Sequence, residues 1–264
     1  MLDWFKRIST PASRKGLVET ESQTPATEAK VERLMGRLGT RSETANNLAG
    51  GFAQTRVIAV VCQKGGAGKT TIAAHLAVQA VMAGQGPAVL VDTDPQKSLG
   101  EWGNARNDNT LALATVKLDH LAVHPVEMRS GGAFVTIIDT PPALTESNER
   151  IIAMADLVLI PARPSPHDLR AIGSTVMMAR GARKPFLFVI NGAAPRANIT
   201  AEAVAALSEH GKVAPVILYQ RTDYAASMIE GLTVMETVPS GRSAQEIGEL
   251  WKYVYAQINI RAAA

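Results

Sequence analysis

The chain has little of several features that mark particular classes of protein. Its 264 residues include a single cysteine, Cys62, which excludes an internal disulfide framework and any site needing two thiolate ligands from one chain. The formal net charge is only +3, so the strong, uniform positive charge of many nucleic-acid-binding domains is absent. The longest hydrophobic region, Ile151–Ala162, contains Asp156 and is shorter than the roughly 18 residues of a membrane span.

The beginning of the sequence, MLDWFKRIST, also lacks the apolar stretch of a secretory signal. Hydrophobic residues make up 46% of the chain, which is enough for a full core. The length allows one large α/β domain or two small ones. We therefore expect a globular cytoplasmic protein.

Composition divides the chain near residue 55. Residues 1–55 hold no strand-like apolar run and carry eight Lys and Arg against six Asp and Glu. Two short amphipathic helices are predicted there, one over residues 1–8 and one that follows Thr24 and ends at Gly39. Helices this short are marginal on their own. We expect a flexible extension whose helices dock on the domain or fray, or bind a partner, with membrane contact through residues 1–8 as the less favoured alternative.

From residue 56 to residue 264, strand-like and helix-like segments alternate. The predicted strands are Val57–Cys62, Ala88–Val91, Phe134–Ile138, Leu157–Ile160, Phe186–Ile190 and Val213–Tyr219, and the predicted helices include Thr70–Ala83, Pro166–Ala179, Ala201–His210 and Ala244–Ile258. The strands are continuously apolar, which indicates burial on both faces of a parallel sheet. The predicted fold class is α/β, with a doubly wound, mainly parallel sheet flanked by helices in one domain.

A glycine-rich turn joins the first predicted strand to the first predicted helix. Its glycines allow the backbone to approach a ligand closely, and the amides of the turn and the following helix N-terminus favour phosphate oxygens. Lys69 is placed to reach the β and γ phosphates, and the Thr70 hydroxyl to bind Mg²⁺. The predicted ATP-binding set is Gly65, Gly66, Ala67, Gly68, Lys69, Thr70 and Thr71.

The turn departs from the common phosphate-loop pattern, because Gln63 stands where a glycine is usual and Lys64 follows it. The run from Lys64 to Thr71 resembles the deviant Walker A motif of the ParA/MinD family of ATPases, and Gln63 resembles the ParA branch. The resemblance implies that Lys64 reaches the nucleotide of a second subunit. A second cation that acts only when two subunits close face to face would couple ATP binding to formation of a homodimer.

Three further segments carry the same resemblance. Asp92-Thr93-Asp94-Pro95-Gln96 is similar to the second acidic motif of the family, and Asp139-Thr140-Pro141-Pro142 is similar to its Walker B motif. Residues 161–169 resemble the proline-rich segment of plasmid-type ParA proteins. The resemblance extends from Arg56 to about Ile258. It leaves out residues 1–55, which are too few for the winged-helix domain of larger ParA proteins.

The aspartates follow strands, so they gather at the carboxyl edge of the sheet, where open α/β folds bind ligands. By the resemblance, Asp139 holds Mg²⁺ through its water shell, Asp92 supports that shell and Asp94 positions the attacking water. Lys64 and Lys69 join Asp94 as catalytic residues, and Asn191 contacts adenine. A carboxylate with an ordinary pKa near 4 is a weak proton acceptor, so we expect slow hydrolysis.

Other patterns indicate packing more than chemistry. His120 and His124 have the spacing of two metal ligands on a helix, but no cysteine or acidic pair completes a site. Tyr253 and Tyr255 lie in an amphipathic last helix, which favours packing over the tyrosine clusters of related kinases. Cys62 is expected to be buried.

The ParA resemblance implies non-specific DNA binding by the ATP-bound dimer, a nucleoid-associated location, and a ParB-like or cargo-adaptor protein that stimulates hydrolysis. Basic residues available for DNA phosphates are Arg180, Arg183, Lys184, Arg196, Lys212, Arg221, Arg242, Lys252 and Arg261. The cargo is a plasmid, a chromosome or a protein assembly. One alternative is a MinD-like ATPase that switches on a membrane or a protein scaffold. Another is a biosynthetic ligase of the same fold, which Lys64 and the proline-rich segment disfavour.

Overall fold

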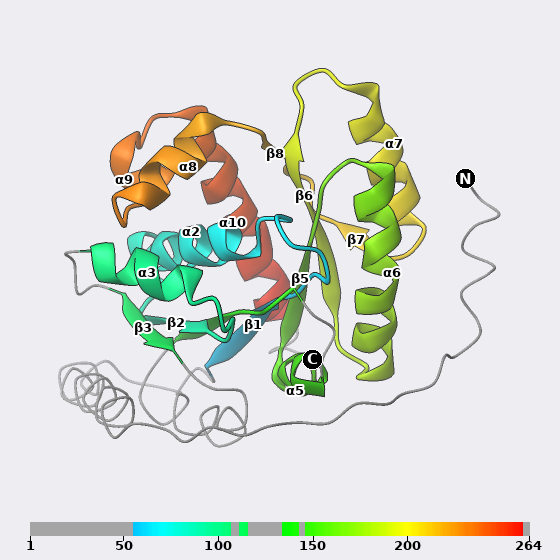
Figure 1. Cartoon of the computed structure of the whole chain (residues 1–264), viewed down its shortest axis with the longest axis horizontal. Coiled ribbons are helices and arrows are strands. Elements are labelled where there is room, and N and C mark those ends of the chain that lie inside the picture. The colour runs from blue at the N-terminus through cyan, green and yellow to red at the C-terminus, as the bar shows by residue number, and fades with distance from the viewer. Residues whose placement is uncertain (1–54, 107–110, 116–133, 143–145, 261–264) are drawn as a thin grey trace.

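The computed structural model describes residues 55–106, 111–115, 134–142 and 146–260 (Figure 1). The first half of the domain contains β1 (Arg56–Val60), α2 (Lys69–Met82), β2 (Ala88–Asp92), α3 (Ser98–Ala105), β3 (Ala112–Thr115), β4 (Val135–Asp139) and α5 (Glu146–Met154). The second half contains β5 (Leu157–Ala162), α6 (Pro166–Gly181), β6 (Phe186–Ala193), α7 (Asn198–Ser208), β7 (Lys212–Val213), β8 (Leu218–Tyr219), α8 (Thr222–Ile229), α9 (Val234–Thr237) and α10 (Arg242–Ile260). The predicted helices within residues 1–55, both histidines at 120 and 124, and Arg261 lie outside the described residues.

The strands form one sheet in the order β3-β2-β4-β1-β5-β6-β7, with β8 paired to β6. Every pairing among the described strands is parallel. From β1 the chain adds β2 and β3 on one side, returns to place β4 between β2 and β1, and then adds β5, β6 and β7 on the other side. The predicted doubly wound α/β fold is confirmed. In such sheets ligands bind outside the carboxyl ends of the strands, beside the strand where the winding direction changes. That strand is β1, which leads into the phosphate loop.

Both faces of the sheet are buried, as continuous apolar strands predict. Ile58 and Val60 of β1 pack in one cluster with residues of α2 and α10, while Val57 and Ala59 pack in the other with residues of α5, α6 and α7. Figure 1 shows α2, α3 and α8–α10 on one side of the sheet and α6 and α7 on the other. The alternation along β1 follows from the two-residue period of a strand.

The structure corrects several predicted elements. The strand expected over residues 213–219 is two short strands, β7 and β8, separated by Pro215, whose missing N–H cannot join a ladder. Helix α3 was not predicted because Gly100 and Gly103 lower helix propensity. Gly103 lies close to β3, since a Cβ there would require the terminal methyl group of Leu113 to move.

Four more elements, β3, α5, α8 and α9, were also missed, each of nine residues or fewer. Cys62 is buried as expected, but it lies two residues beyond the end of β1. Tyr253 and Tyr255 pack against the core, which agrees with their predicted packing role.

Within the described ranges, no helix is long and apolar enough to span a bilayer. The apolar side of the last helix, α10, is used inside the domain. Ile247, Leu250, Trp251 and Val254 are each at most 2% exposed and belong to the cluster that contains β1 and α2. This face of α10 is therefore covered by the protein's own core.

A fully buried histidine joins α2 to α9. The Nδ1 of His75 lies 2.7 Å from the carbonyl oxygen of Thr71, and the N–H of Val234 donates to its Nε2 at 3.2 Å. Because a carbonyl only accepts and a backbone N–H only donates, the ring is neutral with its proton on Nδ1. Burial lowers the pKa of His75 to about 4, although the bond to Thr71 and the charge of Glu236 act in the opposite direction.

His75 is expected to make the free energy of unfolding fall with acidification. Between pH 6.5 and about 4, His75 binds a proton in the unfolded chain but not in the folded chain. Its contribution to the free energy of unfolding is therefore lost as the pH falls through this window, and it is constant above pH 6.5. At about 1.4 kcal/mol per pH unit the loss amounts to about 3 kcal/mol. Urea unfolding of wild type and His75→Gln at pH 7.5 and pH 4.5 measures the difference.

The comparison between variants removes the contribution of carboxylates that also titrate. Replacement of the exposed His167 by glutamine serves as the control and is expected to keep the wild-type pH dependence. Equal pH dependence in His75→Gln and wild type would show that His75 is not the group responsible.

Candidate functional site

The phosphate loop occupies residues 61–68, between β1 and α2. Gly66 and Gly68 have positive φ angles of 74° and 93°, which residues with a Cβ rarely adopt. Gly68 is also the N-cap of α2, so the first amides of that helix have no partner within it. The loop thus has the backbone form that phosphate oxygens bind.

Asn191 fixes the loop from the side. Its Nδ2 donates to the carbonyl oxygen of Ala67 at 2.8 Å, and a Cβ on Gly68 would overlap the same amide nitrogen. The residue lies inside β6, whereas the sequence placed it just after that strand. The contact of Asn191 with adenine stays a prediction. Its bond to Ala67 places it beside the phosphate loop, at the carboxyl edge of the sheet.

The two strand-end aspartates lie side by side. Asp92 is the last residue of β2 and Asp139 the last residue of β4, and the two are register partners in the parallel ladder. Val60 of β1, which leads into the phosphate loop, is the other register partner of Asp139. Neighbouring strands are about 4.8 Å apart, so the register brings both carboxylates next to the loop.

One oxygen of Asp139 is bonded to α2 and the other is not. The Thr70 hydroxyl donates to its Oδ2 at 2.6 Å. Its Oδ1 is buried and has no hydrogen-bond partner within the part of the chain that the structure describes. Burial raises the pKa of Asp139 to about 7, only partly offset by the bond from Thr70.

These features fit a divalent cation. A buried carboxylate oxygen without a partner beside a threonine hydroxyl is a pair of hard oxygen donors of the kind Mg²⁺ prefers. Burial also raises the pKa of Asp92, against the lowering effect of backbone amides on its carboxylate. When bound, the cation would neutralise phosphate charge and compensate for the desolvation of Asp139. Thr70 and Asp139 would hold it, with Asp92 behind them.

Asp94 lies in the turn between β2 and α3. Its amide donates to the Oδ1 of Asp92 at 3.0 Å, and its own Oδ1 accepts from the amide of Gln96 at 3.0 Å. The first bond ties the backbone of Asp94 to the carboxylate of Asp92, and the second holds the Asp94 side chain against the backbone of its own turn. This agrees with the predicted role of orienting a water molecule, which stays a prediction.

The two lysines of the loop have different surroundings. Lys69 is 7% exposed and its Nζ donates back across the loop to the carbonyl oxygen of Lys64 at 3.3 Å. The side chain of Lys64 is 40% exposed, and its Nζ lies 2.8 Å from the Oδ2 of Asp168 at the start of α6. The amine of Lys64 is thus paired with α6, whereas that of Lys69 is bonded within the loop.

Asp168 is a residue that the sequence did not single out. Ser165 caps α6, donating its hydroxyl to the Asp168 carboxylate and accepting from the Asp168 amide. Burial raises the pKa of Asp168, but the bonds from Lys64 and Ser165 outweigh burial and lower it overall. The spacing of a serine cap and an acid three residues later was the available signal, but nothing in it identified Lys64 as the partner.

The basic residues expected to face DNA are not gathered in one place. Arg180, Arg183 and Lys184 precede β6, and Arg196 follows it, so an eight-residue strand of roughly 26 Å separates them. Arg180, Arg183 and Lys184 therefore lie toward one end of β6 and Arg196 toward the other. Arg221 is occupied, since its guanidinium is bonded to Glu246 at 2.7 Å. In the described residues, no group of three or more His, Cys, Asp or Glu side chains is placed to hold a metal ion.

Fold and loop together define a phosphate-loop nucleotide-binding protein of the α/β class. Residues 58–234 match the CobQ/CobB/MinD/ParA nucleotide binding domain. A protein of Halothiobacillus neapolitanus named "Maintenance of carboxysome distribution protein A" is 31% identical over 200 residues, which cover 72% of this chain and 91% of that protein. The chain belongs to the ParA/MinD family, and the predicted resemblance is confirmed.

Solved structures show the same fold at lower identity. Apo McdA from Cyanothece superimposes with a TM-score of 0.64 at 18% identity, covering 76% of this chain and 99% of that one. MinD in the MinC:MinD complex of Aquifex aeolicus gives a TM-score of 0.66 at 15% identity, covering 76% and 96%. The fold class is thus shared by family members of both branches.

Proposed function

We propose that the protein is a ParA-like ATPase that positions cargo through ATP-dependent dimerisation and non-specific DNA binding. The observation that carries the proposal is the separation of the two lysines. The Nζ of Lys69 is bonded within its own phosphate loop, while Lys64 is partly exposed and its Nζ is paired with Asp168 at the start of α6. A second, partly exposed lysine that is not bonded within the loop is available to a nucleotide shared between two subunits.

In this proposal the loop amides and Lys69 bind the phosphates of ATP. The bound Mg²⁺ supplies charge neutralisation at the phosphates, with Thr70, Asp92 and Asp139 around it. Asp94 orients the attacking water, and Asn191 supports the loop and contacts the base. Hydrolysis by a weakly basic carboxylate is slow, which leaves room for stimulation by a ParB-like or cargo-adaptor protein.

We expect DNA binding because dimerisation would double a weakly basic surface. Contacts with phosphates add per Lys or Arg and weaken with salt, and a dimer presents two copies of each surface at once. We infer a nucleoid-associated protein whose cargo is a plasmid, a chromosome or a protein assembly. The name of the Halothiobacillus relative, which refers to carboxysomes, supports including the last of these. We also infer that residues 56–264 are the ATPase domain and that residues 1–55 are an extension.

The MinD-like alternative needs a membrane-binding segment. Within the described residues the apolar side of α10 is buried against α2, which favours the DNA-based function. Predicted membrane contact through residues 1–8 lies outside the described residues. Flotation with anionic vesicles would separate the two functions, and a burst of ADP that depends on a small-molecule substrate would reveal a ligase.

Asp168→Asn is expected to strengthen ATP-dependent dimerisation by about two- to fivefold. Lys64 must leave Asp168 before it reaches a second subunit, and an ion pair with a partly exposed lysine contributes at most about 1 kcal/mol. Lys64→Ala is expected to remain monomeric under the same conditions. Sedimentation with a non-hydrolysable ATP analogue and Mg²⁺ measures the dimer constant.

Asp223→Asn is the control, because it removes an exposed carboxylate that is distant in sequence from the phosphate loop. The Asp223 carboxylate accepts a hydrogen bond from the hydroxyl of Ser243. Its dimer constant is expected to equal that of wild type. A Lys64→Ala variant that dimerises as well as wild type would refute the proposed role of Lys64.

A further inference from the structure

Helix α3 is held at its beginning by the nucleotide-site aspartates. The Oδ2 of Asp92 accepts from the amide of Gly100 at 2.9 Å, and its Oδ1 accepts from the amide of Asp94. The amide of Lys97 donates to the carbonyl oxygen of Asp94 at 2.9 Å. The turn that carries Asp94 and the first turn of α3 therefore share one set of hydrogen bonds.

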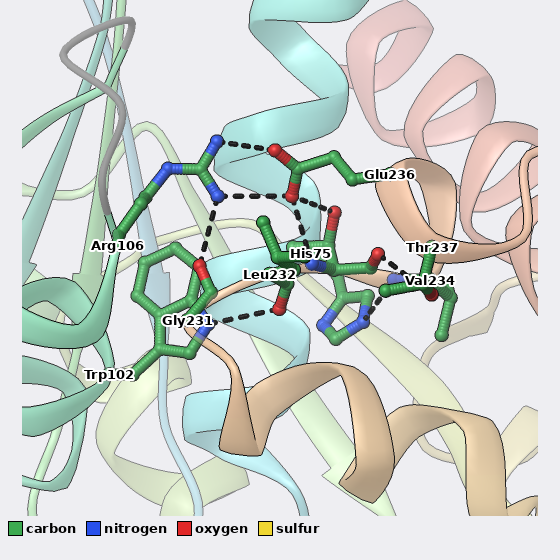
Figure 2. A network of polar contacts seen from close by, with 9 residues as sticks. His75, Trp102, Arg106, Gly231, Leu232, Val234, Glu236 and Thr237 are labelled. Atoms are coloured by element: carbon green, nitrogen blue, oxygen red, sulfur yellow. Dashed lines mark hydrogen bonds and ion pairs between the residues drawn. The ribbon is translucent and has the colours of Figure 1, made fainter.

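The other end of α3 is bonded to residues 231–237, here called the clamp segment (Figure 2). The indole N–H of Trp102 donates to the carbonyl oxygen of Leu232 at 3.0 Å. The guanidinium of Arg106 donates to the carbonyl oxygen of Gly231 at 3.1 Å. The same group forms a bidentate pair with Glu236, with distances of 2.6 and 3.0 Å.

The Arg106–Glu236 pair is enclosed in the protein. The Arg106 side chain is 4% exposed and that of Glu236 is 20% exposed. The Glu236 carboxylate also accepts from the amide and the hydroxyl of Thr233. Thr233 and Glu236 together form the capping box at the beginning of α9. Burial raises the pKa of Glu236, but its bonds from Arg106 and Thr233 outweigh burial and lower it. Breaking such a pair leaves a buried charge without its partner, which is strongly unfavourable.

The clamp segment is fixed in turn to α2, the helix that begins with the phosphate-loop residues. Val234 and Met235 are buried, and the amide of Val234 donates to His75 on α2. Gly231 approaches α3 so closely that a Cβ there would lie 2.5 Å from the amide nitrogen of Arg106. The segment thus bridges α2 and α3, the helices that follow the phosphate loop and the Asp94 turn respectively.

We propose that Arg106 is a positioning residue for ATP hydrolysis. By tying α3 to the clamp segment, and through it to α2, Arg106 keeps the Asp94 turn at a constant position relative to the phosphate loop. The inference rests on the proposed function in one respect, namely that Asp94 orients the attacking water. The residues that bind the phosphates belong to the loop and to α2, so loosening α3 changes turnover without changing nucleotide affinity.

Glu236→Gln tests this proposal while preserving the fold of α9, because glutamine also serves in a capping box. We expect kcat for ATP to fall about tenfold, since displacements near 1 Å are enough to cost this much and more. We expect the Kd for ATP to stay within twofold. Amide hydrogen exchange should quicken across residues 94–102 in the nucleotide-free protein. Arg106→Lys keeps the charge but loses the bidentate geometry. It should lower kcat and quicken amide exchange in the same way as Glu236→Gln, but by less, with the Kd for ATP unchanged.

Glu246→Gln is the control, because it weakens a second Arg–Glu pair, in which two nitrogens of Arg221 donate to the Oε1 of Glu246, and this pair does not involve α3. It should leave exchange at residues 94–102 and kcat as in wild type. Unchanged exchange of α3 in both Glu236→Gln and Arg106→Lys would overturn the proposal, and so would faster exchange with unchanged kcat. If wild type hydrolyses no ATP, the proposed function fails, while the exchange measurement still decides whether Arg106 holds α3.

Discussion

Asp94→Ala is expected to slow ATP hydrolysis by about 100-fold and to leave the Kd for ATP within about threefold of wild type. The carboxylate of Asp94 is bonded to the amide of Gln96 in its own turn, and its amide to Asp92. In the proposed function Asp94 orients the attacking water, so removing its carboxylate is expected to misplace that water, and a misplaced reactant can cost a factor of this size. The phosphate-binding amides and Lys69 are left in place.

Single-turnover hydrolysis and fluorescent-nucleotide binding separate the two quantities. Glu101→Gln, which removes an exposed carboxylate from α3, is the control and should retain wild-type values of both. Turnover by Asp94→Ala at the wild-type rate would remove Asp94 from the mechanism. A parallel loss of binding would mean that Asp94 acts on the ground state of the bound nucleotide.

Gly68→Ala is expected to lower the free energy of unfolding by about 2–3 kcal/mol and to weaken nucleotide binding at least tenfold. The left-handed backbone at Gly68, with φ of 93°, costs a residue with a Cβ about 1–2 kcal/mol. The added methyl group would also displace the Asn191 amide from the carbonyl oxygen of Ala67. The loss of that hydrogen bond contributes about 1 kcal/mol more.

Gly65→Ala isolates this effect in the unfolding measurement. Gly65 does not have a positive φ, and a Cβ there meets nothing within 4 Å, so its substitution should change the free energy of unfolding by less than about 0.5 kcal/mol. Urea denaturation of the three proteins without nucleotide gives the comparison. Equal stability of Gly68→Ala and Gly65→Ala would contradict the described loop geometry.

The phosphate loop and the strand-end aspartates could be predicted because each is encoded in a short, contiguous stretch of the chain. The strand, turn and helix around the phosphate loop are contiguous, and their glycines, Lys69 and Thr70 are within a few residues of one another. The strand-end positions of Asp92 and Asp139 follow from continuous apolar runs. Register then brings the two aspartates together, because parallel strands of an open sheet end at one edge.

Features that depend on distant residues were not predictable from this one sequence. Lys64 and Asp168 are 104 positions apart, and Arg106 and Glu236 are 130 positions apart. One apolar run crosses two elements, of which the sequence predicted the strand over Leu157–Ile160 but not the helix before it. Ile151–Ala162 contains the end of α5 and all of β5, with Asp156 between them accepting from the amide of Val57 at 2.8 Å.

The proposed function requires that ATP switch the protein onto DNA. Binding to random-sequence duplex DNA would be followed with ATP, ADP or no nucleotide, at low and moderate salt, for wild type, Lys64→Ala and Asp94→Ala. We expect binding only with ATP, and we expect salt to weaken it because the contacts are with phosphates. Lys64→Ala should lose DNA binding, and Asp94→Ala should bind DNA equally well or more strongly. Absence of DNA binding in every state, with ATP hydrolysis intact, would contradict the proposed function.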